Sequence, residues 1–497
     1  MAHPFTLQSD GNMDDEMAKL HLANGLVNKA RRYARVPPPR YSDVYPSGPL
    51  SKIVGVRLPG KPPSALWDIS IANGRISSVE AHDHESSGRQ SSPGVLDGAN
   101  RLLAPSLCHA HIHLDKCFLL QDPKFSDLQI ESGDFQEAME MTGKAKSRFE
   151  EDDLLRRGRQ LIEESIHHGV TVMRAFVEVD SGVQMKCLDA GLILKEEFHD
   201  RCEIQLCAFA QLPLFSGDDG GEEVRKLMMK AALRDGVEVL GSTPYVEGDI
   251  HKSKMNVSWI TMLALVHGKH LDLHLDYFLE KHKQPLIWDT LDLIKSRNWT
   301  ERTSKRITLG HCTRLTRFKE EEWQKLKQDI GNLPVAFVGL PTSDLFMMRT
   351  EENVRGTLPV VEMIEKHNLE ASIAVNNVGN AFTPYGSCDP LSIASLGVGI
   401  FQAGTKKDAE ILFVLLLHCP VLESRTNTRM QQTVSERAKA SIGCETTSLQ
   451  IRLGEPADFV LFDRMDSGWK CRKSIAEVVY DASSSRQTIK GGIVTAY

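Results

Sequence analysis

From about residue 102 onward, short apolar runs alternate with segments in which apolar positions recur every three to four residues. The runs predict buried strands, and the second pattern is typical of amphipathic helices. The eight predicted strands are Leu103–His113, Val170–Val179, Glu203–Ala210, Val237–Val246, Leu271–Phe278, Arg306–Thr313, Leu333–Pro341 and Glu370–Val378. The helical patterns between them include Asp152–His168, Glu222–Asp235 and Arg355–Asn368. This alternation predicts an α/β fold, a (β/α)8 TIM-type barrel over residues 105–444.

Both flanks of this region have a β-rich pattern. Trp67–Val79 alternates apolar and polar residues around Asn73-Gly74, which is the strongest short signal for a hairpin. Near the C-terminus, Phe459–Phe462 and the Gly-Gly segment Gln487–Val494 are also predicted strands. No helix covers them, so we expect residues 51–104 and 445–497 to share one small β-sandwich. Residues 1–50 are predicted to be an N-terminal extension, and the sequence leaves open whether it is a lid, an oligomer arm or neither.

Composition narrows the class of partner. The chain has 497 residues and a formal net charge of -7, with no run of Lys or Arg, which argues against a nucleic-acid binder. Ten cysteines form no C-x-x-C pair, so reduced thiols in a cytoplasmic protein are expected. Met1–Ala30 lacks the apolar core of a secretory signal, and the longest apolar run, Ile411–Leu417, is too short to span a bilayer. We therefore expect a small-molecule partner and no membrane or nucleic acid, and a homo-oligomer stays open.

The first predicted barrel strand carries three histidines at alternate positions. On a strand of period two, His109, His111 and His113 are predicted to point to one face. Each buried ring nitrogen needs a partner, and a transition metal supplies one. The alternative is a polar strand with solvated histidines. Two further histidines, His274 and His311, fall near the ends of the fifth and sixth strands, where barrel enzymes place their working residues, and this favours a metal-type site.

Other polar residues fall at the same level of the predicted barrel. Gln211 follows the third strand, and Asp272, His274 and Asp276 share one face of the fifth. His167 and His168 end a predicted helix, where the helix dipole favours cations, and carry no site.

These residues resemble motifs of the amidohydrolase superfamily, specifically its cytosine-deaminase-like branch. The resemblance runs from about residue 52 to the C-terminus. It is carried by Pro105–Lys116 (PSLCHAHIHLDK), Ala208–Gln211 (AFAQ), His274–Asp276 (HLD), Gly310–Cys312 (GHC), Gly454–Asp458 (GEPAD) and Gly491-Gly492.

The resemblance implies a mononuclear hydrolytic centre with one divalent metal ion, with zinc expected and iron or manganese as alternatives. It assigns His111, His113 and His274 to the metal, with Asn376 at the position of the eighth-strand ligand. It places His311 near the metal and the substrate, and it makes Gln211 a substrate contact. In such a centre the metal lowers the pKa of bound water for attack on a C–N carbon.

The chain departs from this family at the groups that move protons. Tyr277 stands at the position of the family's glutamate, and Asn376-Asn377 replace the eighth-strand aspartate pair. An asparagine oxygen can ligate a metal but takes no proton at neutral pH, and tyrosine is a poor base. The candidate catalytic residues are therefore His311, Asp276 and Tyr277, with Asp276 or His109 as substitutes for proton transfer. His109 stands where the family usually has an acid.

Two further positions shape the expected pocket. Phe176 replaces a histidine of the second strand that is common in the branch. Together with Gln211 and Asn377, it completes the predicted substrate-binding set.

Three functions fit these observations. The first is a metal-dependent hydrolase that acts on a non-peptide C–N bond of a small cyclic or heteroaromatic substrate, by deamination or by amide or amidine hydrolysis. The second is a barrel enzyme of a specialised pathway with non-hydrolytic chemistry, such as decarboxylation, elimination or cyclisation. The third is a catalytically silent binding protein. The H-x-E and P-C-x-x-C signature of the zinc deaminases of nucleic acids is absent.

Overall fold

A computed structural model describes residues 48–83, 92–414, 416, 442–444, 447–463, 472–483 and 485–496. The predicted extension, residues 1–50, lies outside this range except for its last three residues. At its centre is an eight-stranded parallel sheet in which the strands follow one another in chain order. The strands are β6 (Leu107–His113), β7 (Val170–Glu178), β8 (Glu203–Ala210), β9 (Val237–Ser242), β10 (His270–Leu275), β11 (Ile307–His311), β12 (Val335–Gly339) and β13 (Ala371–Ile373). A parallel bridge from Ile112 to Asn376 joins the first strand to the segment after the last. The predicted barrel fold is confirmed.

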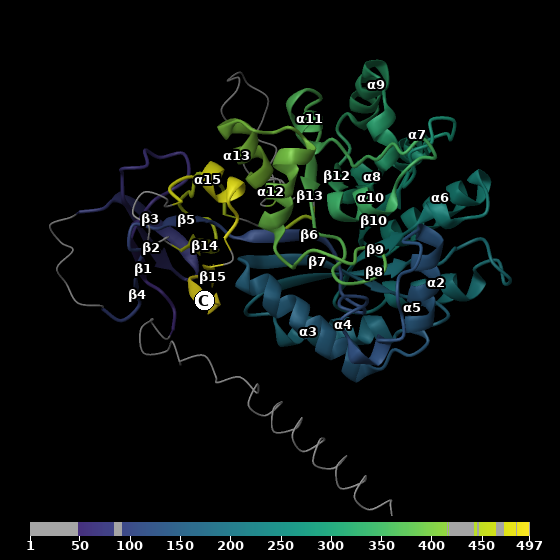
Figure 1. The fold of residues 1–497 in the computed structure, drawn as a ribbon, viewed down its shortest axis with the longest axis horizontal. Coiled ribbons are helices and arrows are strands. Elements are labelled where there is room, and N and C mark those ends of the chain that lie inside the picture. The colour runs from purple at the N-terminus through teal and green to yellow at the C-terminus, as the bar shows by residue number, and fades with distance from the viewer. Residues whose placement is uncertain are drawn as a thin grey trace, which may run out of the picture. The chain divides into compact units, whose positions relative to one another are not determined.

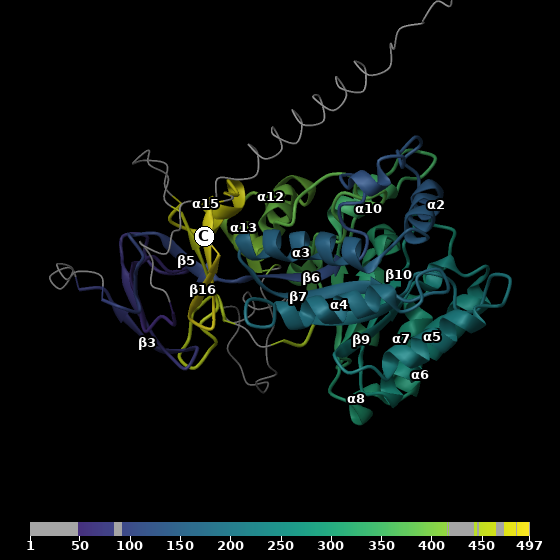
Figure 2. The same ribbon diagram turned by 90° about the horizontal axis from the view of Figure 1, so that it is seen from below.

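Helices follow the strands and lie around the outside of the barrel (Figures 1 and 2). They are α2 (Phe135–Lys146), α3 (Glu151–His167), α4 (Lys186–Glu197), α5 (Glu222–Ala232), α6 (Ile250–Val266), α7 (Ile287–Ser296), α8 (Trp299–Arg302), α9 (Glu320–Ile330), α10 (Pro341–Met347), α11 (Val360–Glu365), α12 (Pro390–Ile400) and α13 (Lys406–Val414). The described residues also form the short 3-10 turns η3 (Pro123–Phe125), η4 (Pro244–Val246) and η5 (Thr313–Arg317). The helix predicted from Arg355 begins only at Val360, because Pro359 disfavours a helical residue before it. None of the described helices is long and apolar enough to cross a membrane.

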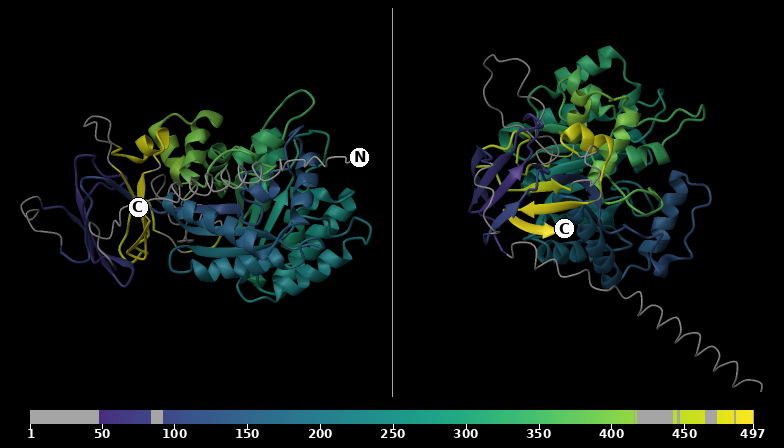
Figure 3. Two further views of the ribbon diagram at one scale, coloured as in Figure 1. Left: turned by 60° about the horizontal axis from the view of Figure 1, so that its bottom comes forward. Right: turned by 60° about the vertical axis from the view of Figure 1, so that its left-hand side comes forward.

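The ends of the chain build two four-stranded sheets beside the barrel (Figure 3). One contains β1 (Lys52–Val56), β2 (Trp67–Ala72), β3 (Arg75–Ala81) and β4 (Val95–Asp97). The other contains β5 (Leu102–Pro105), β14 (Phe459–Phe462), β15 (Arg486–Lys490) and β16 (Ile493–Ala496), with the short α15 (Ile475–Tyr480) before β15. Backbone hydrogen bonds from Leu50 N to Gly492 O and from Gly454 N to Ile76 O, each 2.8 Å, join the two ends. The exact domain boundaries stay a prediction.

The first predicted strand, Leu103–His113, is in fact two strands. β5 pairs antiparallel with β14, whereas β6 pairs parallel with β7. Ser106 marks the change, since its backbone N donates to Asp458 O at 3.1 Å and its hydroxyl lies 2.6 Å from the Thr171 hydroxyl. The chain therefore passes from the small sheets into the barrel within one residue.

An irregularity in β6 corrects the prediction that its three histidines share one face. His109 pairs with Met173 and Ile112 pairs with Ala175, so β6 carries one more residue than β7 between these pairs. Such a bulge reverses the alternation of side chains along the strand. His109 lies 3.2 Å from the Ser165 hydroxyl of α3, whereas His111 and His113 lie among the site residues described below.

Candidate functional site

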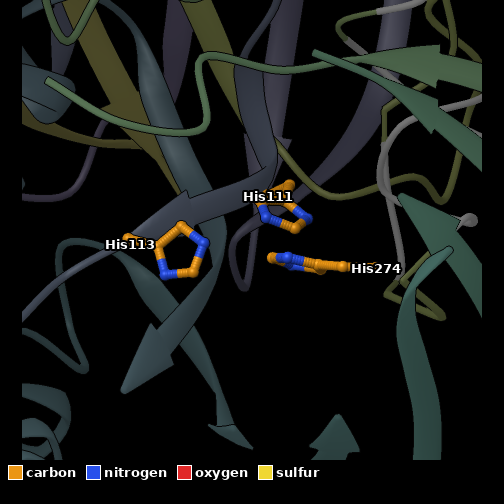
Figure 4. Close-up of side chains that lie close together, drawn as sticks. All are labelled: His111, His113 and His274. Carbon is orange, nitrogen blue, oxygen red and sulfur yellow. The ribbon is translucent and has the colours of Figure 1, made fainter. Parts of the chain in front are cut away.

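Three buried histidines from two strands converge at one end of the barrel. His111 and His113 come from the end of β6, and His274 is the second-last residue of β10. Their ring centroids are 5.3 Å (His111–His113), 4.6 Å (His111–His274) and 5.4 Å (His113–His274) apart. One nitrogen from each lies within 4.8 Å of the others, and Figure 4 shows the rings gathered around a common space. This spacing suits three ligands of one metal ion.

Buried polar atoms around this space are left without hydrogen-bond partners among the described residues. They are both ring nitrogens of His111, Nδ1 of His113, Nε2 of His274 and Oδ1 of Asn376. Asn376 donates its amide Nδ2 to Ser343 Oγ at 2.7 Å, so its oxygen is the atom left for a further partner. An unpaired buried polar atom costs about 1–3 kcal/mol, and several around one point indicate a place that binds a ligand. The donor set therefore fits a divalent metal ion.

Electrostatics keep these histidines in the form that binds metals. Burial is the main cause that lowers the pKa of His111, His113 and His274 well below the usual value. Nearby Lys116 lowers all three further. The nearby side chain of Asn376 raises the pKa of His111 and so offsets part of this lowering, although the Asn376 oxygen is not in hydrogen-bond geometry with the ring. The imidazoles are neutral at physiological pH, as metal ligation requires.

His311, the last residue of β11, is held by a carboxylate from the next helix. Its Nδ1 lies 2.7 Å from Oδ1 of the fully buried Asp344 on α10. Asp344 Oδ2 accepts a hydrogen bond from Thr357 Oγ1 at 2.6 Å. Because Nδ1 is occupied by Asp344, Nε2 is the nitrogen of His311 that can exchange a proton with a bound molecule.

A cavity with a volume of about 20 Å³ adjoins the histidines. It is lined by His113, Lys116, Phe135, Gln211, Tyr245, His274, Tyr277, His311, Ser343, Asn376, Asn377 and Phe382. The predicted residues Gln211, Asn377 and Tyr277 are thus brought together here with His311. The ring of Tyr277 lies against that of His311 with centroids 3.9 Å apart, and its hydroxyl donates to Ser343 O at 3.4 Å.

Lys116 is a cavity residue to which the sequence argument gave no role. Its ammonium donates to Glu178 Oε1 at 2.7 Å and to Gln211 Oε1 at 3.3 Å. Glu178 is also paired with Lys146 of α2, which in turn contacts Asp180. These charges lower the pKa of Glu178 to about 2 against its desolvation. The lysine therefore presents a fixed positive charge at the cavity wall.

Asp276, predicted to move protons, lies elsewhere. Its carboxylate accepts hydrogen bonds from the backbone N of Leu286 at 2.7 Å and of Ile287 at 3.1 Å, at the start of α7. It is not among the residues that line the cavity, and its φ of 48° breaks the strand alternation on which the prediction rested. Burial raises its pKa to about 7. Its geometry gives no support to a catalytic role.

His109 and Phe176 are also outside the cavity lining. His109 faces α3, where it lies against Ser165, and burial lowers its pKa to about 4, so its geometry gives no support to the role of the missing acid. Phe176 is fully buried and stacks on His111 with centroids 3.9 Å apart. Its position behind His111 gives no support to the predicted contact with a substrate.

No protein-family model matches the chain. A curated relative is N-isopropylammelide isopropyl amidohydrolase of Pseudomonas sp. strain ADP, 21% identical over 406 residues that cover 82% of this chain and 89% of the relative. Among solved structures, 5-methylcytosine deaminase of Klebsiella pneumoniae superposes with a TM-score of 0.72 at 20% identity, over 89% of this chain and 97% of that one. This is the amidohydrolase fold. The predicted resemblance to the superfamily and its cytosine-deaminase-like branch is confirmed.

A further structural neighbour was solved with a bound metal ion. An adenosine deaminase of Xanthomonas campestris with bound zinc superposes with a TM-score of 0.58 at 14% identity, over 91% of this chain and 94% of that one. Together with the histidine cluster, this supports a divalent metal in the barrel of this chain.

Proposed function

We propose that the protein is a metal-dependent hydrolase that cleaves a non-peptide C–N bond in a small heteroaromatic substrate. One observation carries the proposal. Buried ring nitrogens of His111, His113 and His274 and the amide oxygen of Asn376 have no hydrogen-bond partner among the described residues, and they lie beside a cavity that is lined by His311. The named relatives, an amidohydrolase and a deaminase, support the same reaction class.

The three histidines and the Asn376 oxygen hold the metal, which supplies Lewis-acid activation of water when bound. Zinc suits three imidazole nitrogens best, and iron and manganese are the alternatives. A neutral amide in place of a carboxylate removes one negative charge from this set. The chain therefore binds its metal less tightly than a site with four charged or imidazole ligands.

Residues of the chain itself provide proton transfer and substrate binding. His311, oriented by Asp344, exchanges a proton with the substrate through Nε2, which fills part of the role of the absent carboxylates. Lys116 and Gln211, already joined by a hydrogen bond, bind polar atoms of the ring, and Asn377 contributes an amide. Asn380 Nδ2 donates to Asn377 Oδ1 at 2.8 Å and fixes that amide. Tyr277 shapes the cavity around His311 and serves as a neutral hydrogen-bonding group, since burial raises its pKa.

We also infer a cytoplasmic protein that works without nucleic-acid or membrane partners, and a homo-oligomer is compatible with this. Five buried cysteines among the described residues form no disulfide: Cys117, Cys187, Cys207, Cys312 and Cys388. This supports a reducing compartment.

Metal reconstitution tests the reaction class. We expect less than one metal per purified chain, and turnover of a panel of aminopyrimidines, aminotriazines and N-alkylated derivatives that rises when zinc, iron or manganese is supplied. Ammonia or amine release is the measurement. Product formation without release of either would favour the non-hydrolytic alternative, and no turnover with full metal occupancy would favour the silent binding protein.

The double variant Tyr277→Glu with Asn376→Asp distinguishes two histories of the site. Either a deaminase has lost its proton-transfer groups, or the cavity has been adapted to another substrate. We expect metal affinity to rise by ~10-fold or more, because a charged ligand replaces a neutral one. We expect no gain of cytosine deamination, because Phe135, Tyr245 and Phe382, which the variant leaves in place, still line and restrict the cavity. General acid–base catalysis is worth ~10²–10⁴-fold, so a gain of that size in the double variant would show a decayed deaminase instead.

A further inference from the structure

The cavity beside the histidines is too small for the ring it is proposed to bind. Its volume of about 20 Å³ holds roughly one water molecule. A second, larger chamber of about 830 Å³ lies next to it, within the range of ~300–1,000 Å³ that is usual for ligand pockets. Phe135, Tyr245 and Tyr277 line both spaces. These three side chains therefore form the partition between them.

The three rings of the partition are in mutual contact. Their centroids are 6.0 Å (Phe135–Tyr245), 6.1 Å (Phe135–Tyr277) and 5.6 Å (Tyr245–Tyr277) apart, which gives two edge-to-face pairs and one tilted pair within the usual range of aromatic contacts. A molecule that passes from the chamber to the histidines must displace at least one ring.

Phe135 is the ring with the weakest restraint. Tyr277 is buried, packs on His311 and donates its hydroxyl to Ser343 O, and the hydroxyl of Tyr245 interacts with Gln211. Phe135 has no polar atom, is half-buried and is the first residue of α2. The far end of α2 is fixed by the contacts of Lys146 with Glu178 and Asp180. Movement at the start of the helix therefore leaves its anchor intact.

The outer chamber offers mainly apolar contacts. Its acidic side chains already have partners: Glu247 accepts from Leu214 N and Asn256 Nδ2, Asp249 caps α6, and Glu280 is paired with Lys283. The apolar part of the wall is formed by Ile250, Phe278, Leu279, Met347 and Met348, and the further polar lining residues are Ser253, Gln284 and Arg349. Methionines and aromatic rings suit a planar or aliphatic ligand group.

We propose that this chamber is a subsite for an apolar substituent on the substrate, with Phe135 as a movable divider between the substituent and the reacting ring. This inference rests on the proposed function, because it takes the histidine cavity as the place of the ring. It narrows the substrate class to heteroaromatic rings that carry an aromatic or branched aliphatic group, joined by a linker that passes between Phe135 and the two tyrosines.

Calorimetric titration of the zinc-loaded full chain with cytosine and N4-benzylcytosine tests the subsite. We expect the benzyl compound to bind at least about tenfold more tightly, since the chamber buries its apolar ring. Ile250→Glu, which places a charge in the chamber wall at a position already 48% exposed, should remove most of this advantage and leave cytosine binding unchanged. The matched control Leu233→Glu, at a 71% exposed position outside both cavities, should change neither.

Stopped-flow binding tests the divider. Phe135→Ala should speed association of both compounds several-fold, whereas Phe346→Ala, a half-buried phenylalanine that lines neither cavity, should not. Equal affinities for the two compounds, or an unchanged preference in Ile250→Glu, would overturn the subsite. Association rates in Phe135→Ala equal to those of the parent chain would overturn the role of Phe135 as a movable divider. Both measurements report binding, so a benzyl preference without turnover would refute the proposed function alone, and turnover without that preference would refute the subsite alone.

Discussion

His274→Ala should abolish metal retention and all metal-dependent turnover. Loss of a hydrogen-bond partner of a metal ligand typically lowers metal affinity ~10–100-fold, and loss of the ligand itself should cost more, about 10³-fold or greater. The effect should be this large because the other ligand candidates lie on β6 or at Asn376, which is bridged to β6 through Ile112. Among the described residues, His274 is the only ligand candidate from another part of the barrel. Metal content after dialysis and the rate of amine release measure it.

His270→Ala is the matched control on the same strand. His270 is also buried, and its Nδ1 accepts a hydrogen bond from Arg306 N at 3.0 Å, away from the cavity. We expect this variant to lose about 1–3 kcal/mol of stability, because an N–H group is left unpaired, and to keep its metal. Equal metal loss in both variants would mean that damage to the fold, and not to a ligand, explains the first result.

Asp344→Asn should lower kcat by ~10²–10⁴-fold with metal content unchanged. The amide keeps the size of the side chain but no longer stabilises a protonated His311 or selects its tautomer. Steady-state rates and metal analysis on the same samples test this.

Asp276→Asn separates a catalytic from a structural carboxylate. Both aspartates are buried, but the carboxylate of Asp276 accepts backbone N–H groups at the start of α7. We expect the asparagine variant to unfold at a lower temperature with kcat within a few-fold of the parent chain. A loss of kcat as large as that in Asp344→Asn would restore Asp276 as the proton carrier and contradict the assignment to His311.

Much of the fold follows from local pattern. Short buried runs such as Ile307–His311 separated by amphipathic helices specify the barrel, because each strand–helix unit buries its apolar face the same way. His111, His113, His274 and His311 could be predicted as neighbours since all lie near the ends of their strands, and the carboxyl ends of barrel strands meet at one face.

What could not be predicted depends on local breaks in strand geometry and on distant partners. The bulge in β6 turns His109 outward, and the positive φ of Asp276 redirects its carboxylate to α7. Neither is visible in the alternation of residues. Asp344 stands on a helix after β12 and reaches His311 across 33 positions of the chain. The available signal was a polar residue in the first helical turns after a barrel strand, and many surface residues share it.

Anomalous X-ray scattering at the zinc absorption edge, from crystals of the chain supplied with zinc, tests the central claim most directly. The account predicts one peak per chain, bounded by His111, His113, His274 and the Asn376 oxygen, with metal–nitrogen distances of about 2.0–2.1 Å. A fully supplied chain with no peak between these residues, or with its only peak elsewhere, would contradict it.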